Sequence, residues 1–226
     1  MDRKERRRGR KIARENRERQ VRLQVIMAVL SAAALVAVLA AGIFKATEKV
    51  EEIRHEKEAE ELEEREEELL SDSVLQYEDL VKYYAEEEGI EEHVPVLLAI
   101  MEVETRGERD DVMQSSESAG LEPDSLGPEE SIAQACDYYA GLVRRAEETG
   151  VDRNTIIQAY NYGPNYIYFI EENGGVHTFD LAVEYAEKMS EGRTANYTHY
   201  IADDNGNWMY LYGNMYYVKL VEQYLP

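Results

Sequence analysis

Residues 94–104 read VPVLLAIMEVE, an apolar run that ends in two glutamates. Residues 94–101 are apolar on every side of a helical projection, which is typical of a helix buried inside a domain. Pro95 stands at an early helical position, where a missing N–H is tolerated. The stretch therefore predicts a buried central helix with other elements packed around it.

The residues on either side predict that those elements are mostly helices. Residues 105–128 are polar and rich in Gly, Ser and Asp, and they predict a long loop. Residues 200–212 alternate around Asp204-Asn205-Gly206, which predicts one small β-hairpin. Apolar periodicity, glycine stops and capping residues predict further helices at residues 77–88, 129–149, 152–160, 179–189 and 216–224. The expected fold class is mainly α.

The second glutamate of the run, Glu104, is the first candidate for a functional residue. It follows Leu97, Ile100 and Met101 by seven, four and three residues, so it projects from an apolar helix face. Burial raises the pKa of a carboxyl group, which suits an acid that protonates a glycosidic oxygen. A helix-end glutamate in solvent is the alternative, and Glu102, facing nearly the opposite way, could claim the same role by position.

Residues 25–44 contain no charged side chain and are long enough to cross a membrane. Twenty helical residues span the ~30 Å hydrocarbon core. Residues 1–24 contain eleven Lys or Arg against four Asp or Glu, which predicts a basic cytoplasmic tail. A cleaved signal peptide is the alternative, but the apolar run is longer than is usual there. We expect an uncleaved single-pass anchor, with the rest of the chain outside the cell.

Residues 45–72 are expected to form an acidic helical stalk. Residues 46–72 contain thirteen Asp or Glu against four Lys or Arg, and neither glycine nor proline. Apolar residues recur along this segment, but Lys57 and Glu60 interrupt the heptads that a coiled coil would need. Packed patterns begin after the stalk, so we expect residues 73–226 to be the globular domain.

The composition of that domain argues against several functions. Residues 73–226 contain nine Lys or Arg against thirty Asp or Glu, and phosphate binding needs clustered positive charge, so no nucleic-acid partner is expected. The four histidines lack metal-ligand spacing and no cofactor motif occurs, so neither a metal nor a cofactor is expected. Cys136 lies in an apolar helical pattern, which favours a small core residue over a nucleophile.

Three sequence blocks resemble the lysozyme-like family of Gram-positive cell-wall muramidases. They are AIMEVETRGERDDVMQSSESAGL (Ala99–Leu121), QAYNYG (Gln158–Gly163) and YGNMYYVKLVEQYL (Tyr212–Leu225). The family is related to goose-type lysozymes and soluble lytic transglycosylases, and it supplies the muramidase domain of cell-wall hydrolases carried by conjugative transposons. Because the blocks occur in family order, the resemblance implies a lysozyme-like fold for residues 74–225.

The resemblance also implies roles for single residues. Glu104 matches the catalytic glutamate of the family's Glu-Ser-Gly-Gly pattern, and Thr105 replaces a serine whose hydroxyl would support the acid. Arg106 in place of glycine is a larger change at the cleft edge. The matching substrate-binding positions are Gln114 and Ser115 in the Met-Gln-Ser-Ser block, Tyr160 and Asn161 in the Ala-Tyr-Asn block, and Tyr217, the late tyrosine that approaches the acid in related transglycosylases.

A second catalytic carboxylate is implied at Asp111. It matches the aspartate of the family's Asn-Asp-Pro-Met-Gln pattern, with Asp110 in place of asparagine and Val112 in place of proline. Hydrolysis with inversion requires a base about 6.5–9.5 Å from the acid, which a loop residue could supply. A loop-capping role for Asp111 is an equal alternative.

Together these features predict a membrane-anchored muramidase that cuts the bond between N-acetylmuramic acid and N-acetylglucosamine at the bacterial cell surface. Its expected partners are peptidoglycan glycan strands, the membrane through residues 25–44, and envelope or conjugation machinery. A lytic transglycosylase is the close alternative, because it uses the same glutamate without a second carboxylate. An inactive wall-binding scaffold, suggested by the long stalk, is the third.

Overall fold

The computed structural model describes residues 69–225 and, before them, only Met27, Lys45 and Lys49. This described part is mainly helical, as predicted, with one two-stranded antiparallel sheet. Its α-helices are α2 (Asp72–Leu75), α3 (Glu78–Glu88), α4 (Val94–Glu104), α5 (Pro128–Thr149), α6 (Arg153–Tyr162), α7 (Asn165–Glu172), α8 (Phe179–Ser190) and α9 (Tyr217–Val221). Short 3-10 helices are η1 (Glu91–His93), η2 (Ser116–Ala119), η3 (Tyr200–Asn205) and η4 (Glu222–Tyr224), and the strands are β1 (Thr194–Asn196) and β2 (Trp208–Tyr210).

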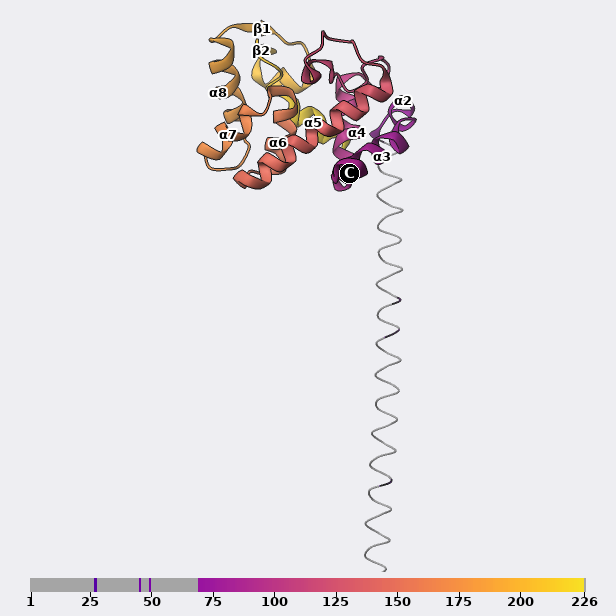
Figure 1. The fold of residues 1–226 in the computed structure, drawn as a ribbon. Coiled ribbons are helices and arrows are strands. Elements are labelled where there is room, and N and C mark those ends of the chain that lie inside the picture. The colour runs from indigo at the N-terminus through magenta and orange to yellow at the C-terminus, as the bar shows by residue number, and fades with distance from the viewer. Residues whose placement is uncertain (1–26, 28–44, 46–48, 50–68, 226) are drawn as a thin grey trace, which may run out of the picture. The chain divides into compact units, whose positions relative to one another are not determined.

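Helix α4 is the centre of the domain, as its apolar sequence predicted. Every residue from Val96 to Glu102 is buried, and α4 contacts α2, α3 and α9. Figure 1 shows α2 and α3 beside α4, and α3 packs in turn against α5. The long helix α5 buries one face in the same core, where burial raises the pKa of Cys136 to about 12. Cys136 is therefore the inert core thiol that its sequence pattern predicted.

The boundary between α5 and α6 follows from two local signals in the sequence. Gly150 ends α5 in the left-handed conformation, with φ 74°. The carboxylate of Asp152 then caps α6 by accepting a hydrogen bond from the backbone N–H of Thr155 at 3.3 Å. The same carboxylate accepts the N–H of His177 at 2.9 Å, so this cap also fixes the segment that follows α7.

Helix α7 had no counterpart among the predicted helices, and aromatic packing explains its place. The rings of Tyr162 on α6 and Tyr166 on α7 meet edge to face, with centroids 5.3 Å apart. Tyr185 on α8 lies 5.6 Å from the Tyr162 ring and 5.1 Å from the Tyr166 ring. These three tyrosines join the three helices, and such pairs add to the gain from burial alone.

The hairpin differs from its prediction in the position of the first strand. Strand β1 pairs antiparallel with β2, and Ala195 lies opposite Met209. Residues 200–205, expected to form the first strand and its turn, form the helix η3 instead. Gly206, with φ 77°, ends this helix in the left-handed conformation. A glycine in this conformation is common both at the end of a helix and in a hairpin turn, so the sequence signal fitted either structure. The hairpin was predicted correctly, but its boundaries were wrong.

The packed domain begins slightly before Ser73, where we expected its boundary. The side chain of Leu70 is buried in the core, and Ser71 hydrogen-bonds through its N–H and its hydroxyl to the carboxylate of Glu102, at 2.9 and 2.8 Å. A Cβ on Gly107 would lie 2.2 Å from the carbonyl oxygen of Ser73. The entering chain is therefore packed directly against the C-terminal end of α4.

The predicted anchor and stalk lie almost entirely outside the described residues. The chain divides into two units, residues 1–61 and 62–226, and the domain described above belongs to the second. Among the residues that the structure describes, no helix has the length and apolar character needed to cross a membrane. The expectation for residues 25–44 therefore remains a prediction.

Candidate active site

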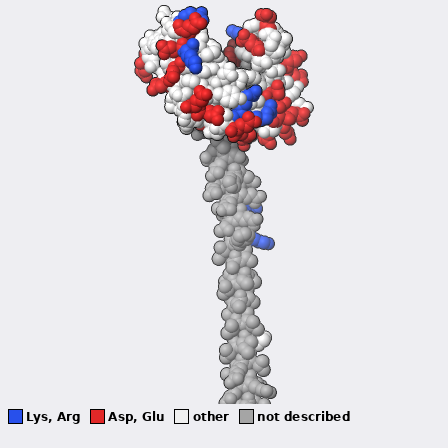
Figure 2. Space-filling model, turned by 60° about the vertical axis from the view of Figure 1, so that its left-hand side comes forward, with Lys and Arg blue, Asp and Glu red and all other residues white. Residues whose placement is uncertain are grey.

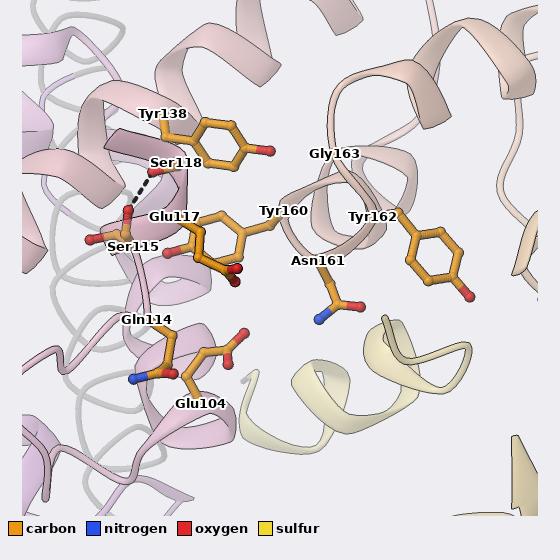
Figure 3. Close-up of a pocket in the computed structure, with 10 residues that line it drawn as sticks. All are labelled: Glu104, Gln114, Ser115, Glu117, Ser118, Tyr138, Tyr160, Asn161, Tyr162 and Gly163. Carbon is orange, nitrogen blue, oxygen red and sulfur yellow. Dashed lines mark hydrogen bonds between the residues drawn. The ribbon is translucent and has the colours of Figure 1, made fainter. Parts of the chain in front are cut away.

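A pocket of about 380 Å³ opens where the C-terminal end of α4 meets the C-terminal end of α6. Its walls come from α4, the loop before η2, η2 itself, α5 and the last turn of α6 (Figure 3). Of the residues predicted from the sequence, Glu104, Gln114, Ser115, Tyr160 and Asn161 line it. The fold thus brings together residues that lie up to about sixty positions apart in the chain.

Glu104 is the last residue of α4, and its carboxyl group points into the pocket (Figure 3). Burial raises the pKa of this carboxyl to about 7, against the opposing effect of a hydrogen bond from Tyr217, and the charge of Asp111 raises it further. Near neutral pH the group therefore exists substantially in its protonated form. A protonated carboxyl group that faces an open pocket can act as a general acid.

Tyr217 holds one oxygen of that acid. Its phenol donates a 2.6 Å hydrogen bond to Oε1 of Glu104, from the first residue of α9. The ring is almost fully buried, and burial, with the nearby Glu104, raises the pKa of the phenol well above its ordinary value. The phenol therefore stays protonated and remains a donor, which leaves Oε2 of Glu104 as the oxygen available to a bound ligand.

Gln114 sits in a left-handed backbone conformation, with φ 48°, which is uncommon for a residue other than glycine. Its side-chain amide donates to the carbonyl of Asp111 at 3.1 Å and to the carboxylate of Asp124 at 2.8 Å. Both bonds use Nε2, so the amide oxygen is directed into the pocket toward Glu104 (Figure 3). Local strain of about 1–3 kcal/mol, held by two hydrogen bonds, is common at binding sites.

Tyr160 and Asn161 line the wall contributed by α6. The Tyr160 hydroxyl donates to the carbonyl of Met113 at 2.8 Å, which ties α6 to the loop before η2. Asn161 accepts the N–H of Asn214 at 2.6 Å through Oδ1, so its NH₂ group is free to donate to a ligand in the pocket. Gly213 permits this arrangement, because a Cβ there would lie 2.4 Å from Oδ1 of Asn161.

Thr105 does not line the pocket, and its hydroxyl is engaged elsewhere. It donates to the carbonyl of Val112 at 2.7 Å and accepts the N–H of Gly107 at 3.1 Å. The hydroxyl was expected to support Glu104. In the structure it instead closes the loop that follows α4.

Asp111 also lies outside the pocket wall, buried beneath the loop with 1% of its surface exposed. Its Oδ1 accepts from the N–H of Ser115 at 2.9 Å and the hydroxyl of Ser131 at 2.6 Å. Its Oδ2 accepts from the N–H and the hydroxyl of Ser116 at 3.1 and 2.5 Å. Burial opposes the charge, but these four hydrogen bonds outweigh it and lower the pKa of Asp111. The geometry matches the loop-capping alternative.

Glu102 is removed from the pocket by its own partners. Its carboxylate accepts both hydrogen bonds from Ser71 and pairs with the guanidinium of Arg106, whose Nε lies 3.3 Å from Oε1. Only 3% of Glu102 is exposed, on the side of α4 that faces the entering chain. Of the two glutamates that end the run, Glu104 is the one that reaches the pocket.

Five further residues, which the sequence did not single out, also line the pocket. Tyr138 on α5 meets the Tyr160 ring edge to face, with centroids 5.6 Å apart. Glu117 lies three residues after Gln114, within a block that the resemblance had already marked, so its position was available as a signal. No such signal pointed to Tyr138. The five are Glu117, Ser118, Tyr138, Tyr162 and Gly163.

The face of the domain seen in Figure 2 carries more acidic than basic side chains. Figure 2 shows acidic side chains over much of the visible face of the domain, with fewer basic ones between them, and a notch between two rounded parts.

The buried central helix, the small hairpin and a carboxyl group at the end of that helix together define a lysozyme-like protein. The family profile described as Lysozyme-like matches residues 71–225, and the chain belongs to this family.

Several known proteins are similar to this chain. The uncharacterized membrane protein YocA of Bacillus subtilis is 33% identical over 69% of this chain and 69% of its own length. Pneumococcal vaccine antigen A of Streptococcus pneumoniae is 35% identical over 64% of this chain and 74% of its own. The bifunctional muramidase/DL-endopeptidase CwlT of B. subtilis is 33% identical over 52% of this chain and 35% of its own.

A solved structure shares the fold. The crystal structure of a Staphylococcus aureus protein, described as similar to a lipoprotein of the NLP/P60 family, superposes with a TM-score of 0.69 at 46% identity. The match covers 70% of this chain and 54% of the staphylococcal chain. This chain therefore spans about half of that protein and about a third of CwlT.

Proposed function

We propose that this protein cleaves the glycan strands of peptidoglycan, with Glu104 as the general acid. The observation that carries the proposal is the position of Glu104, whose carboxyl group faces an open pocket with its pKa raised to about 7 by burial. Glycoside cleavage needs a carboxylic acid that is still protonated near neutral pH, so that it can protonate the leaving oxygen.

The pocket walls support a sugar ligand. Sugars are held by hydrogen bonds to their hydroxyl and acetamido groups and by aromatic faces. The NH₂ of Asn161 and the side-chain oxygen of Gln114 offer a donor and an acceptor, and Tyr138 and Tyr160 supply aromatic surface. The lysozyme-like family and the muramidase activity in the name of CwlT point to peptidoglycan as the polymer.

Muramidase action, with water as the acceptor, is the reaction that we propose first. The bond between the anomeric carbon of N-acetylmuramic acid and the oxygen of N-acetylglucosamine breaks, and Glu104 gives its proton to that oxygen. Oε1 of Glu104 already accepts a hydrogen bond from Tyr217, so Oε2 is the oxygen from which the proton is donated to the substrate.

Lytic transglycosylase action is the second candidate, and one observation favours it. Asp111, the expected base, is buried and already accepts four hydrogen bonds, so it cannot hold a water molecule in the pocket. In a transglycosylase the 6-hydroxyl of the same muramic acid attacks its anomeric carbon, and no second carboxylate is needed. The role of Glu104 is the same in both reactions.

Mass spectrometry of the fragments released from purified peptidoglycan tests the proposal. We expect the full-length protein to release disaccharide muropeptides and the Glu104→Gln variant to release none, because the variant keeps the shape and loses the transferable proton. Release at the wild-type rate by the variant would refute Glu104 as the acid. Reducing muramic ends identify a muramidase, and 1,6-anhydro ends identify a transglycosylase.

We further propose that residues 25–44 anchor the protein, with residues 73–226 at the cell surface. The charge-free span and its basic flank support this, together with the description of YocA as a membrane protein. Protease added to intact protoplasts should degrade the domain and spare the basic N-terminal tail. Loss of the tail while the domain stays protected would show the opposite topology.

A further inference from the structure

We propose that Glu117 is the catalytic base of this enzyme, the group that activates the attacking water. The inference rests on the proposed muramidase function and adds a residue to it. Glu104 and Glu117 are the two residues with carboxyl groups among the described residues that line the pocket. Figure 3 shows both carboxyl groups directed into the same space, Glu104 from α4 and Glu117 from η2.

The two carboxyl groups lie in opposite environments. Such a difference allows one carboxyl group of a pair to act as the acid and the other as the base. Glu104 is held by Tyr217 and has its pKa raised by burial, so it keeps a proton to donate. Glu117 is exposed to solvent, and within the described residues its carboxylate accepts no hydrogen bond and forms no ion pair. It is therefore free to take a hydrogen bond from a water molecule.

The backbone that carries Glu117 is fixed from below. Asp111 binds the N–H groups of Ser115 and Ser116, the two residues directly before Glu117. The hydroxyl of Ser115 donates to the carbonyl of Ser131 on α5 at 2.8 Å. Asp111 is thus a positioning residue for the turn that presents Glu117, and it acts without reaching the pocket.

The reaction balances with these two groups. Glu117 accepts a proton from water as the water oxygen forms a bond to the anomeric carbon of the muramic acid. The bond from that carbon to the bridging oxygen breaks, and Glu104 donates its proton to this oxygen. The products are a reducing muramic end and a free hydroxyl on the glucosamine, and the two carboxyl groups return to their starting protonation by exchange with solvent.

Glu117→Gln tests the base while preserving the shape of the side chain. We expect turnover of the full-length protein on purified peptidoglycan to fall about 10²–10⁴-fold, the usual worth of a general base. The thermal midpoint should stay unchanged, because the side chain has no partner to lose. Glu148→Gln, the same change at an exposed position of α5 outside the pocket, is the matched control and should keep wild-type turnover.

A second variant separates a base from a residue that only binds sugar. In Glu117→Ala, added azide can replace water as the nucleophile. Azide needs no base to deprotonate it, and it can occupy the space left by the carboxylate. We expect azide to restore bond cleavage and to give a muramic-acid azide of inverted configuration at the anomeric carbon. Wild-type turnover by Glu117→Gln, no azide product from Glu117→Ala, or anhydro ends from the wild type would each overturn this assignment. The loss of activity in Glu104→Gln would still support glycan cleavage.

Discussion

The phenol of Tyr217 donates a 2.6 Å hydrogen bond to Oε1 of Glu104, and the two residues are 113 positions apart in the chain. Tyr217 lies beside Glu104 because α9 packs against α4. This bond does two things to the acid. It fixes the orientation of the carboxyl group, and it lowers a pKa that burial has raised.

Tyr217→Phe should therefore raise the pKa of Glu104 above about 7 and extend the alkaline limb of the pH–activity profile by about one unit. Turnover at pH 6 should fall roughly tenfold, because the carboxyl group is no longer held in one orientation. A pH profile of glycan cleavage measures both effects. Tyr83→Phe, at an exposed ring, is the control. An unchanged alkaline limb would contradict the role assigned to Tyr217.

Glu104→Gln should stabilise the protein while removing its activity. A carboxyl group whose folded pKa is raised contributes stability below its unfolded pKa of about 4.3, and this is lost as the pH rises through about 7. At pH 8 the variant should melt about 2–5 °C higher than the wild type, and at pH 4 the two should agree. Calorimetry at both pH values measures the difference. A variant that is less stable at pH 8 would show that Glu104 is not penalised by burial.

Asp111→Asn should destabilise the domain by about 2–4 kcal/mol at pH 7, because an amide cannot accept all four of the hydrogen bonds that Asp111 accepts. The folded pKa of Asp111 is lowered, so its contribution is present above the unfolded value of about 3.9 and is lost as the pH falls through the folded pKa. Denaturant unfolding at pH 7 and pH 3 should show a smaller difference at the lower pH. The exposed Asp137→Asn should change neither value.

Gly213→Ala should impair the pocket more than the fold. Its φ is 49°, and an added Cβ would lie 2.4 Å from Oδ1 of Asn161 and 2.7 Å from the Tyr162 ring. Glycan cleavage should fall at least tenfold as Asn161 is displaced. Gly192→Ala imposes similar backbone strain at φ 73°, with nothing within 4 Å of the new Cβ. Equal activity in the two variants would argue that Asn161 does not contact the substrate.

The sequence predicted the centre of the fold because burial leaves a direct mark on it. The apolar run 94–101 indicated a helix enclosed by others, and Asp152 and Gly150 marked their helix ends by local chemistry. The hairpin boundaries failed for a different reason. Of the aromatic residues in 200–212, Trp208 and Tyr210 lie in β2, but Tyr200 lies exposed in the 3-10 helix η3, so the alternation marked only one of the two strands. Periodicity over a short segment does not separate these cases.

The sequence predicted some residues of the site but not the contacts that their side chains make. Glu104 was marked by its place on an apolar face, but the choice over Glu102 needed the family resemblance. The structure adds the physical difference, which is that Ser71 and Arg106 occupy the carboxylate of Glu102. The surroundings of Asp111 could not be predicted, because one of its donors, Ser131, is 20 residues away on α5. Side-chain partners that distant depend on the whole fold.

The bonds between Ser71 and Glu102 also have a mechanical meaning. Glu102 lies two residues before Glu104 on the same helix, and Ser71 is the point at which the chain enters the domain. Tension along the preceding chain would be delivered first to these two hydrogen bonds and to the close contact of Gly107 with Ser73. Such tension would therefore act on the C-terminal end of α4, which carries Glu104.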